Sequence, residues 1–199
     1  DLLTLQEHLP EKKFSDLKVV YVGDIRNNIT YAWMCGAALM GINFIAYGPD
    51  ALYPAKFQLD KLNHIAKLNG AKITITSDSA NLLGADAVYT DTWVSMGEED
   101  QLLTRYDLLH QYKVTWQMLA QTNNPKVLFM HCLPAFHNMQ TDIARNAWDK
   151  YGIDICEVDD DVFNSTNSVV FDQAENRLHT IKAILSATLN ENIWESIYE

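Results

Sequence analysis

The sequence lacks any apolar run long enough to cross a bilayer, and no signal-peptide pattern opens it. Positive charge is also scarce, since 15 lysines and arginines stand against 26 aspartates and glutamates, for a net charge of −11. This balance argues against nucleic acid or an anionic membrane surface as the main partner. A small anionic substrate is still compatible with it, because a binding site needs only local positive charge.

Cysteine is the next scarce residue. The three cysteines, Cys35, Cys132 and Cys156, are odd in number, and none lies in a CxxC pair. This pattern predicts reduced thiols and a cytoplasmic protein rather than a disulfide framework.

What is abundant is apolar residues, at 48% of 199 residues, which is enough for one α/β domain with extensions or at most two small domains. The chain opens inside an amphipathic helix with Leu2, Leu5 and Leu9 on one stripe. Such an opening is typical of a piece of a longer chain, and processing could give the same pattern. At the other end, residues 190–199 carry Ile193 and Trp194 and are expected to pack on something outside this domain.

Short β-rich segments alternate with helical ones. We expect strands at residues 17–24, 42–49, 71–76, 86–93, 126–132 and 168–172, and helices at 29–41, 55–70, 78–85, parts of 103–122, and 173–189. Continuous apolar strands separated by helices predict an α/β fold, an open parallel sheet with helices on both faces. Residues 135–158 are the expected insertion in this pattern.

Ligands bind outside the carboxyl ends of the strands in such sheets. Polar clusters follow four of the expected strands, at residues 24–28, 91–99, 131–134 and 172–177. This coincidence predicts a ligand site at one edge of the sheet.

The first of these turns, VGDIRNN, has Gly23 but no G-x-G-x-x-G, so the Rossmann-like pattern comes without the dinucleotide fingerprint and NAD is not expected. Asn27 and Asn28 can bind a ligand through their amides, or they can cap the following helix. Asp91 ends an apolar strand and needs a partner there. That partner is either a bound ammonium or a neighbouring lysine or arginine. The loop Ser95–Gly97 could wrap an amino-acid carboxylate with its N–H groups.

His131 and Cys132 are the two metal-ligand residue types at the end of the fifth strand. Neighbours on a strand point to opposite faces, and no second Cys/His pair follows, so a zinc site is disfavoured. The same alternation deprives a Cys132 nucleophile of its base. A buried inert cysteine and a neutral thiol that hydrogen-bonds a substrate both remain open.

Arg177 is expected in the first turn of the last helix, after an Asp172–Glu175 capping box. Arginine is unfavourable at the positive end of a helix dipole unless it faces an anion. A pair with Glu175 or Asp172 is the alternative.

At these four clusters the chain resembles the ornithine carbamoyltransferases, through GDIRNN, DTWVSMGEE, MHCLPAFH and FDQAENRLHTIKA in that order. The resemblance covers essentially all 199 residues, but only the family's second, ornithine-binding domain. It implies transfer of a carbamoyl group from carbamoyl phosphate to L-ornithine, giving L-citrulline and phosphate. It also implies a cytoplasmic homotrimer with no cofactor and no metal.

Carried over by residue, the resemblance implies that Asn28, Asp91, Ser95 and Met96 bind ornithine. Cys132, the Leu133 backbone and Arg177 would contact carbamoyl phosphate, and the catalytic set would be Asp91, Cys132 and Arg177. Residues 1–16 would then be an interdomain helix and linker, 17–189 the ornithine-binding domain, and 190–199 a tail packing toward the N-terminal domain.

The departures from the family keep two alternatives open. The N-terminal carbamoyl phosphate domain is missing from this sequence, and Tyr31 and Trp33 stand where the family usually has smaller residues. A transferase for another amine, such as putrescine, is disfavoured by SMG, because a diamine has no carboxylate to hold. A non-catalytic amino-acid-binding remnant is the other alternative.

Overall fold

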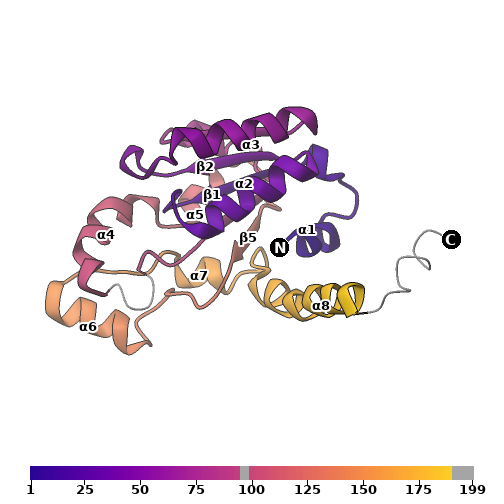
Figure 1. Ribbon diagram of the computed structural model, residues 1–199. Coiled ribbons are helices and arrows are strands. Elements are labelled where there is room, and N and C mark those ends of the chain that lie inside the picture. Colours follow the sequence, from indigo (N-terminus) through magenta and orange to yellow (C-terminus); the bar gives the residue numbers. More distant parts are fainter. Residues whose placement is uncertain (95–98, 190–199) are drawn as a thin grey trace.

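The computed structural model describes residues 1–94 and 99–189. Five strands form an all-parallel sheet in the order β3-β2-β1-β4-β5 (Figure 1). The strands are β1 (Lys18–Val22), β2 (Asn43–Tyr47), β3 (Lys72–Thr76), β4 (Ala87–Thr90) and β5 (Leu128–His131). The predicted α/β fold with a parallel sheet is confirmed.

Helices cover both faces of this sheet. One face carries α1 (Leu2–His8), α2 (Asn28–Met40) and α3 (Lys56–Leu68), whose apolar residues join a core cluster with β1, β2 and β4. The other face carries α5 (Trp116–Ala120) and α7 (Asp160–Phe163) over a second cluster. Four consecutive residues of β1 are buried because both faces of the strand are covered.

The turn after β1 is built by local rules. The Asn27 side chain accepts a hydrogen bond from the Thr30 N–H and caps α2, which ends at Gly41 with φ of +81°. Gly48, after β2, lies so close to this turn that a Cβ on it would collide with the Gly23 carbonyl oxygen. Glycine at position 48 therefore lets the ends of β1 and β2 meet.

The predicted sixth strand is wrong. Ser168 makes only an isolated bridge to Phe129, and helix α8 (Val170–Leu189) begins two residues later. Val170, Gln173 and Asn176 are the buried residues of α8, and their spacing is that of a helix face. The short apolar run Ser168–Phe171 could not be told from a strand by its composition alone.

The region predicted as partly helical, residues 103–122, divides into α4 (Leu102–Leu109), a short 3-10 turn and α5. The helix expected at 78–85 is a 3-10 helix, Ser79–Leu82, and the Asp78 side chain caps it by accepting a hydrogen bond from the Ala80 N–H. Within the expected insertion, α6 (Asp142–Tyr151) packs Ala144 and Ala147 against a small separate cluster.

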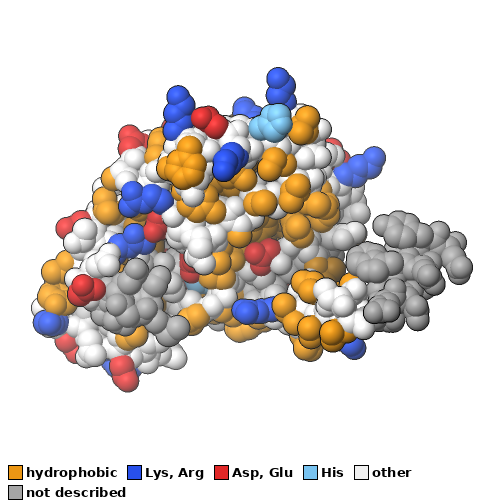
Figure 2. Space-filling view, in the orientation of Figure 1, with side chains coloured by type: hydrophobic (Ala, Val, Ile, Leu, Met, Phe, Trp, Pro, Cys, Tyr) orange, Lys and Arg blue, Asp and Glu red, His pale blue; other side chains and the backbone are white. Residues whose placement is uncertain are grey.

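Hydrophobic side chains are exposed along the outer part of α8, where they gather in the lower right of Figure 2. They are Leu178, Ile181, Ile184, Leu185 and Leu189. Among the described residues, no helix has the length and apolar character needed to cross a membrane.

Candidate functional site

The strand order places a switch point at β1. The chain runs from β1 outward to β2 and β3, then returns to the other side of β1 with β4 and β5. Ligands bind at such a point, outside the carboxyl ends of the strands. The register pairs Val22 with Thr90 and Thr90 with His131, so the three strands end level. Gly23, Asp91 and Cys132 are therefore the next residues at one edge, as the sequence predicted.

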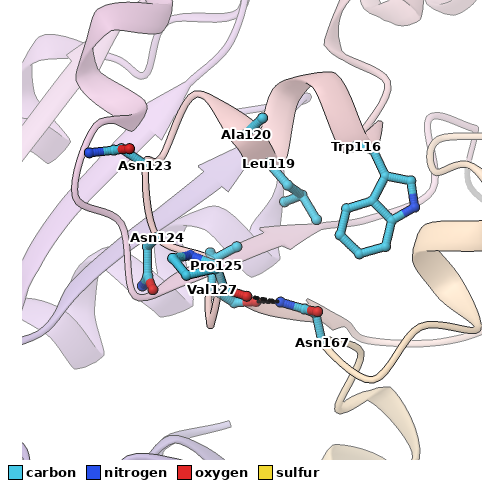
Figure 3. Close-up of a pocket in the computed structure, with 8 residues that line it drawn as sticks. All are labelled: Trp116, Leu119, Ala120, Asn123, Asn124, Pro125, Val127 and Asn167. Atoms are coloured by element: carbon cyan, nitrogen blue, oxygen red, sulfur yellow. Dashed lines mark hydrogen bonds between the residues drawn. The ribbon is translucent and has the colours of Figure 1, made fainter.

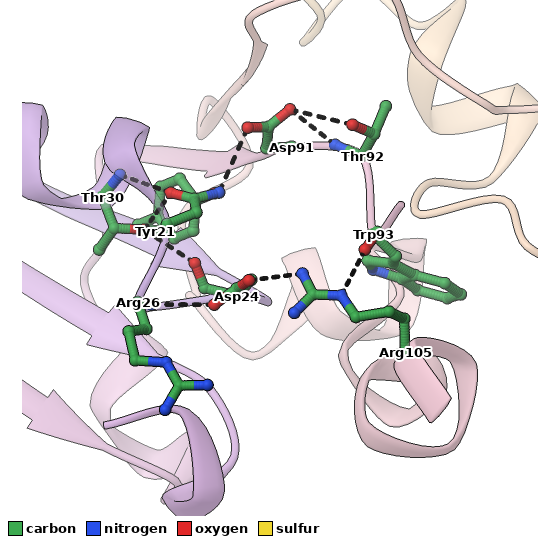
Figure 4. A network of polar contacts seen from close by, with 9 residues as sticks. Tyr21, Asp24, Arg26, Thr30, Asp91, Thr92, Trp93 and Arg105 are labelled. Atoms are coloured by element: carbon green, nitrogen blue, oxygen red, sulfur yellow. Dashed lines mark hydrogen bonds and ion pairs between the residues drawn. The ribbon is translucent and has the colours of Figure 1, made fainter. Parts of the chain in front are cut away.

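Asp91 belongs to a polar network at this edge, and Figure 4 shows it joined to Thr92. Its carboxylate accepts hydrogen bonds from the Thr92 N–H at 2.7 Å, the Cys132 thiol at 3.0 Å and the Asn27 amide at 3.3 Å. Within residues 1–94 and 99–189 it forms no ion pair. The lysine or arginine partner left open by the sequence is thus not among the described residues, and a half-buried carboxylate faces the switch point without a cation.

The two asparagines of the first turn have different environments. Asn27 is held by its cap and by a 2.7 Å hydrogen bond to the Tyr21 hydroxyl. Asn28 is the first residue of α2, and its exposed side chain makes no hydrogen bond to the described part of the chain. The capping role therefore belongs to Asn27, and within residues 1–94 and 99–189 nothing occupies the Asn28 amide.

Cys132 faces Asp91, whereas His131 faces the opposite side and pairs with Glu157. The predicted alternation of these neighbours is confirmed. Burial raises the pKa of the Cys132 thiol, and the nearby Asp91 carboxylate raises it further. The thiol is thus a protonated hydrogen-bond donor at neutral pH, which does not suit a thiolate nucleophile. The described residues contain no group of three or more metal-ligating side chains.

Arg177 lies on α8 beside Cys132. Both line a cavity of about 280 Å³, together with Tyr89 and Gln173. The expected capping box is wrong, because α8 begins at Val170 and the Asp172 carboxylate instead contacts His8 at 2.8 Å. Arg177 is consequently the eighth residue of the helix, outside its first turn, so the helix-dipole argument does not apply to it.

Arg177 is also exposed, and no ion pair of its side chain with Asp172, Glu175 or another described residue is present. A guanidinium beside the cavity with no acid partner in the described part of the chain can bind an anion. Of the predicted α8 cluster, Arg177 reaches the site, whereas Asn176 turns inward to α1.

Gln173 is a site residue that the sequence reasoning missed. Its side-chain oxygen accepts a hydrogen bond from the His131 N–H at 3.0 Å, and its amide donates to Asp1 at 2.8 Å and to the Tyr89 hydroxyl at 3.3 Å. It thereby fixes α8 to the last residue of β5. A polar residue on the buried stripe of a helix is the signal that could have identified it.

Arg105, on α4, is a second missed residue. Its Nε donates to the Trp93 carbonyl at 2.7 Å and its Nη2 pairs with Asp24 at 2.5 Å (Figure 4). Both side chains of this ion pair are largely buried. Arg105 therefore joins the segment after β4 to the turn after β1.

The remaining predictions fall outside the network or outside the description. Ser95 and Met96 lie outside the described residues. Leu133 is adjacent to Cys132 and has φ of +46°, which is uncommon for a residue with a branched side chain.

The bulky residues Tyr31 and Trp33 do not fill the site. Trp33 is buried and stacks on Phe44, with ring centroids 6.1 Å apart, and it meets Tyr89 edge-on. Tyr31 packs half-buried against the same core. Both rings therefore belong to the core cluster on this face of the sheet.

A separate cavity of about 390 Å³ lies at the amino end of β5, away from this network (Figure 3). Trp116, Leu119 and Val127 form its apolar wall. Of the predicted site residues that the structure describes, none lines it.

The pattern of the aspartate/ornithine carbamoyltransferase Asp/Orn binding domain matches residues 15–188. The chain belongs to this family. The "Ornithine carbamoyltransferase, catabolic" of Clostridium perfringens strain 13 is 50% identical over 190 residues, which cover 94% of this chain and 57% of that protein. The ornithine carbamoyltransferase of Limosilactobacillus reuteri strain DSM 20016 is 48% identical over 193 residues, 96% of this chain and 57% of the relative.

Solved structures agree with this membership. The ornithine carbamoyltransferase of Pyrococcus furiosus superposes with a TM-score of 0.77 at 32% identity, over 94% of this chain and 53% of that one. The ornithine transcarbamoylase of Giardia lamblia gives 0.78 at 30% identity, over 96% and 58%. The chain thus spans somewhat more than half the length of the relatives it matches.

Proposed function

We propose that the whole protein is an ornithine carbamoyltransferase and that this chain is its ornithine-binding half. The reaction transfers the carbamoyl group of carbamoyl phosphate to the side-chain amine of L-ornithine and yields L-citrulline and phosphate. The relatives described above carry this activity in their names, and they match nearly all of this chain.

The observation that carries the proposal is the Asp91 carboxylate at the switch point. It is half-buried, accepts hydrogen bonds from three neutral residues, Asn27, Thr92 and Cys132, and has no cationic partner among the described residues. Ornithine carries two ammonium groups, and one of them paired with Asp91 would supply the missing charge. The amino-acid end of ornithine is proposed to be held by Asn28 together with Ser95 and Met96, which belong to the segment after Asp91.

On the other side of the site, Cys132, the Leu133 backbone and Arg177 are proposed to contact carbamoyl phosphate. The free amine of ornithine attacks the carbonyl carbon, a C–N bond forms, the C–O bond to phosphate breaks, and the amine loses a proton. Arg177 would stabilise the negative charge on the departing phosphate. Cys132 acts as a neutral thiol, so no covalent enzyme intermediate is needed, and the rate comes from positioning and electrostatics.

The proposal also assigns partners to this half. Residues 1–16 would lead from a carbamoyl phosphate-binding N-terminal domain, residues 17–189 form the ornithine-binding domain, and residues 190–199 would pack toward the N-terminal domain. The last segment lies outside the described residues. A cytoplasmic homotrimer, with no cofactor and no metal, is the proposed assembly.

The test is citrulline formation by the full-length protein, with ornithine and putrescine compared as amine acceptors. We expect turnover of ornithine, and a loss of at least about 100-fold in kcat/KM with putrescine, because a diamine lacks the carboxylate that the Ser95–Met96 loop would bind. A full-length protein that makes no citrulline would refute the proposal. Preference for putrescine would move the protein to the sister activity.

A further inference from the structure

His131 and Glu157 form a buried pair on the side of β5 away from the ligand site. His131 Nε2 lies 3.0 Å from Glu157 Oε1, and both side chains are 0% exposed. Neither side chain can touch a substrate in this arrangement. Any effect of the pair on chemistry must therefore pass through the residues that it holds.

The hydrogen bonds of His131 fix the position of its proton. The Leu133 N–H donates to His131 Nδ1 at 3.0 Å, so Nδ1 carries a lone pair rather than a hydrogen. The ring proton is consequently on Nε2, which donates it to Glu157. In a neutral histidine, the hydrogen bond made by one ring nitrogen determines whether the other nitrogen carries the proton.

Glu157 holds the same loop from its other end. Its Oε1 accepts a second hydrogen bond, at 2.6 Å, from the Phe136 N–H. The two side chains therefore hold the backbone on both sides of Leu133–Ala135. Leu133, at φ of +46°, is in a conformation that leucine rarely adopts without such support.

The pair is poorly designed for stability alone. Glu157 Oε2 is buried and has no hydrogen-bond partner among the described residues. Burial raises the pKa of Glu157, and the hydrogen bonds from His131 and Phe136 oppose that rise. A buried carboxylate with one oxygen unpaired lowers the stability of the fold. The presence of Glu157 here is explained if its hydrogen bonds set the geometry of the loop.

We propose that His131 and Glu157 are positioning residues, which hold the Leu133 backbone and the adjacent Cys132 thiol where they contact carbamoyl phosphate. This inference rests on the proposed function. It assigns to the pair neither proton transfer nor substrate contact. Glu157 lies 26 positions after His131, so the segment that follows α6 supplies one member of the pair.

The test uses the full-length protein with His131→Phe, Glu157→Leu and Glu157→Gln. Phenylalanine and leucine remove the hydrogen bonds to the loop, whereas the glutamine oxygen can still accept from both His131 and Phe136. We expect the first two variants to lose about 10- to 100-fold in kcat and to raise KM for carbamoyl phosphate, with KM for ornithine changed by less than about twofold. Glu157→Gln should keep most of the wild-type kcat.

A matched control lies in the same loop. His137 pairs with Asp160 at 2.5 Å in a partly exposed contact and stacks on Phe163, so His137→Phe keeps the stacking and removes a histidine–carboxylate pair outside the site. It should retain wild-type kinetics. The ¹⁵N spectrum of labelled histidine gives a readout independent of turnover, and it should show His131 protonated on Nε2 in the wild type and in Glu157→Gln.

Wild-type kcat in both His131→Phe and Glu157→Leu would overturn the inference, as would a His131 proton on Nδ1. Equal rises in both KM values would indicate a purely structural role and would also overturn it. If His131→Phe does not fold, the kinetics of Glu157→Leu and Glu157→Gln and the ¹⁵N spectrum still test the inference. A wild-type protein without citrulline formation would instead refute the proposed function.

Discussion

At the level of single residues, the contact between Cys132 and Asp91 determines which chemistry the site can perform. A thiol that donates to a carboxylate at 3.0 Å keeps its proton, and it leaves that carboxylate able to accept from an ammonium as well. This arrangement favours binding and orientation of charged groups over a covalent bond to the Cys132 sulfur. Arg177 supplies the positive counterpart at the same cavity.

The raised pKa of Cys132 makes a prediction about thiol reactivity. We expect Cys132 to be alkylated by iodoacetamide at least about 100-fold more slowly than the exposed Cys35 at pH 7.5, because the thiolate is the reactive form and Cys132 is also sheltered. Peptide mass spectrometry after timed labelling measures both rates. Equal rates at the two cysteines would contradict the account.

The sign of the pH effect on stability follows from the same shift. The folded state holds the Cys132 proton more tightly than the unfolded state does. Its contribution to the free energy of unfolding is thus complete below the ordinary thiol pKa of about 8.5 and is lost as the pH rises above that value. Labelling of Cys132 should accelerate in the same alkaline range.

Asp91, Cys132, Arg177 and Asn28 could be placed at one edge from the sequence, because parallel strands end together and neighbours on a strand alternate. Arg105 and Glu157 could not be found in this way. Arg105 lies 81 positions from its partner Asp24, and Glu157 lies beyond α6 from His131. Single-sequence periodicity contains no information about which distant side chains meet.

At the level of elements, helix α8 forms one wall of the cavity that Arg177 and Cys132 line. The sequence places the start of this helix too late, because Val169 and Val170 are typical of a strand. The buried residues Val170, Gln173 and Asn176 instead lie on one face of a helix. Five of the six expected strands are present, and the sixth is replaced by a single bridge beside β5. This change brings Gln173 onto the His131 backbone and Arg177 beside the cavity.

Helix α8 is fixed to α1 by Asn176, which leads to a prediction. The buried Asn176 amide donates to the Thr4 hydroxyl at 3.0 Å and to the Glu7 carboxylate at 2.5 Å. Asn176→Ala removes both bonds and leaves the buried Thr4 hydroxyl without this partner, so we expect α1 to open more easily by about 2 kcal/mol. Hydrogen–deuterium exchange of the α1 amides measures the effect.

The control for this helix is Glu175→Ala, since Glu175 is the exposed neighbour on α8. It should leave α1 exchange within about 0.5 kcal/mol of wild type. Unchanged exchange in Asn176→Ala, or the same acceleration in both variants, would show that α1 is held by something other than Asn176.

At the level of the whole molecule, the proposal concerns how this chain relates to the rest of the protein. The chain spans 57% of its Clostridium perfringens relative, and α8 presents a row of exposed hydrophobic side chains (Figure 2). The cavity beside Arg177 and Cys132 opens on the same side of the domain as α1 and α8. Both features fit the proposal that the rest of the protein completes the carbamoyl phosphate site.

The central claim is that the Asp91 carboxylate receives an ammonium group of ornithine. The most direct measurement is kcat/KM for ornithine in full-length Asp91→Asn, with Asp78→Asn, an exposed aspartate after β3, as the control. Asparagine keeps the shape and loses the charge, so we predict a fall of about 100-fold or more in Asp91→Asn and wild-type values in Asp78→Asn. An Asp91→Asn protein that keeps kcat/KM for ornithine within about threefold of wild type would contradict the account.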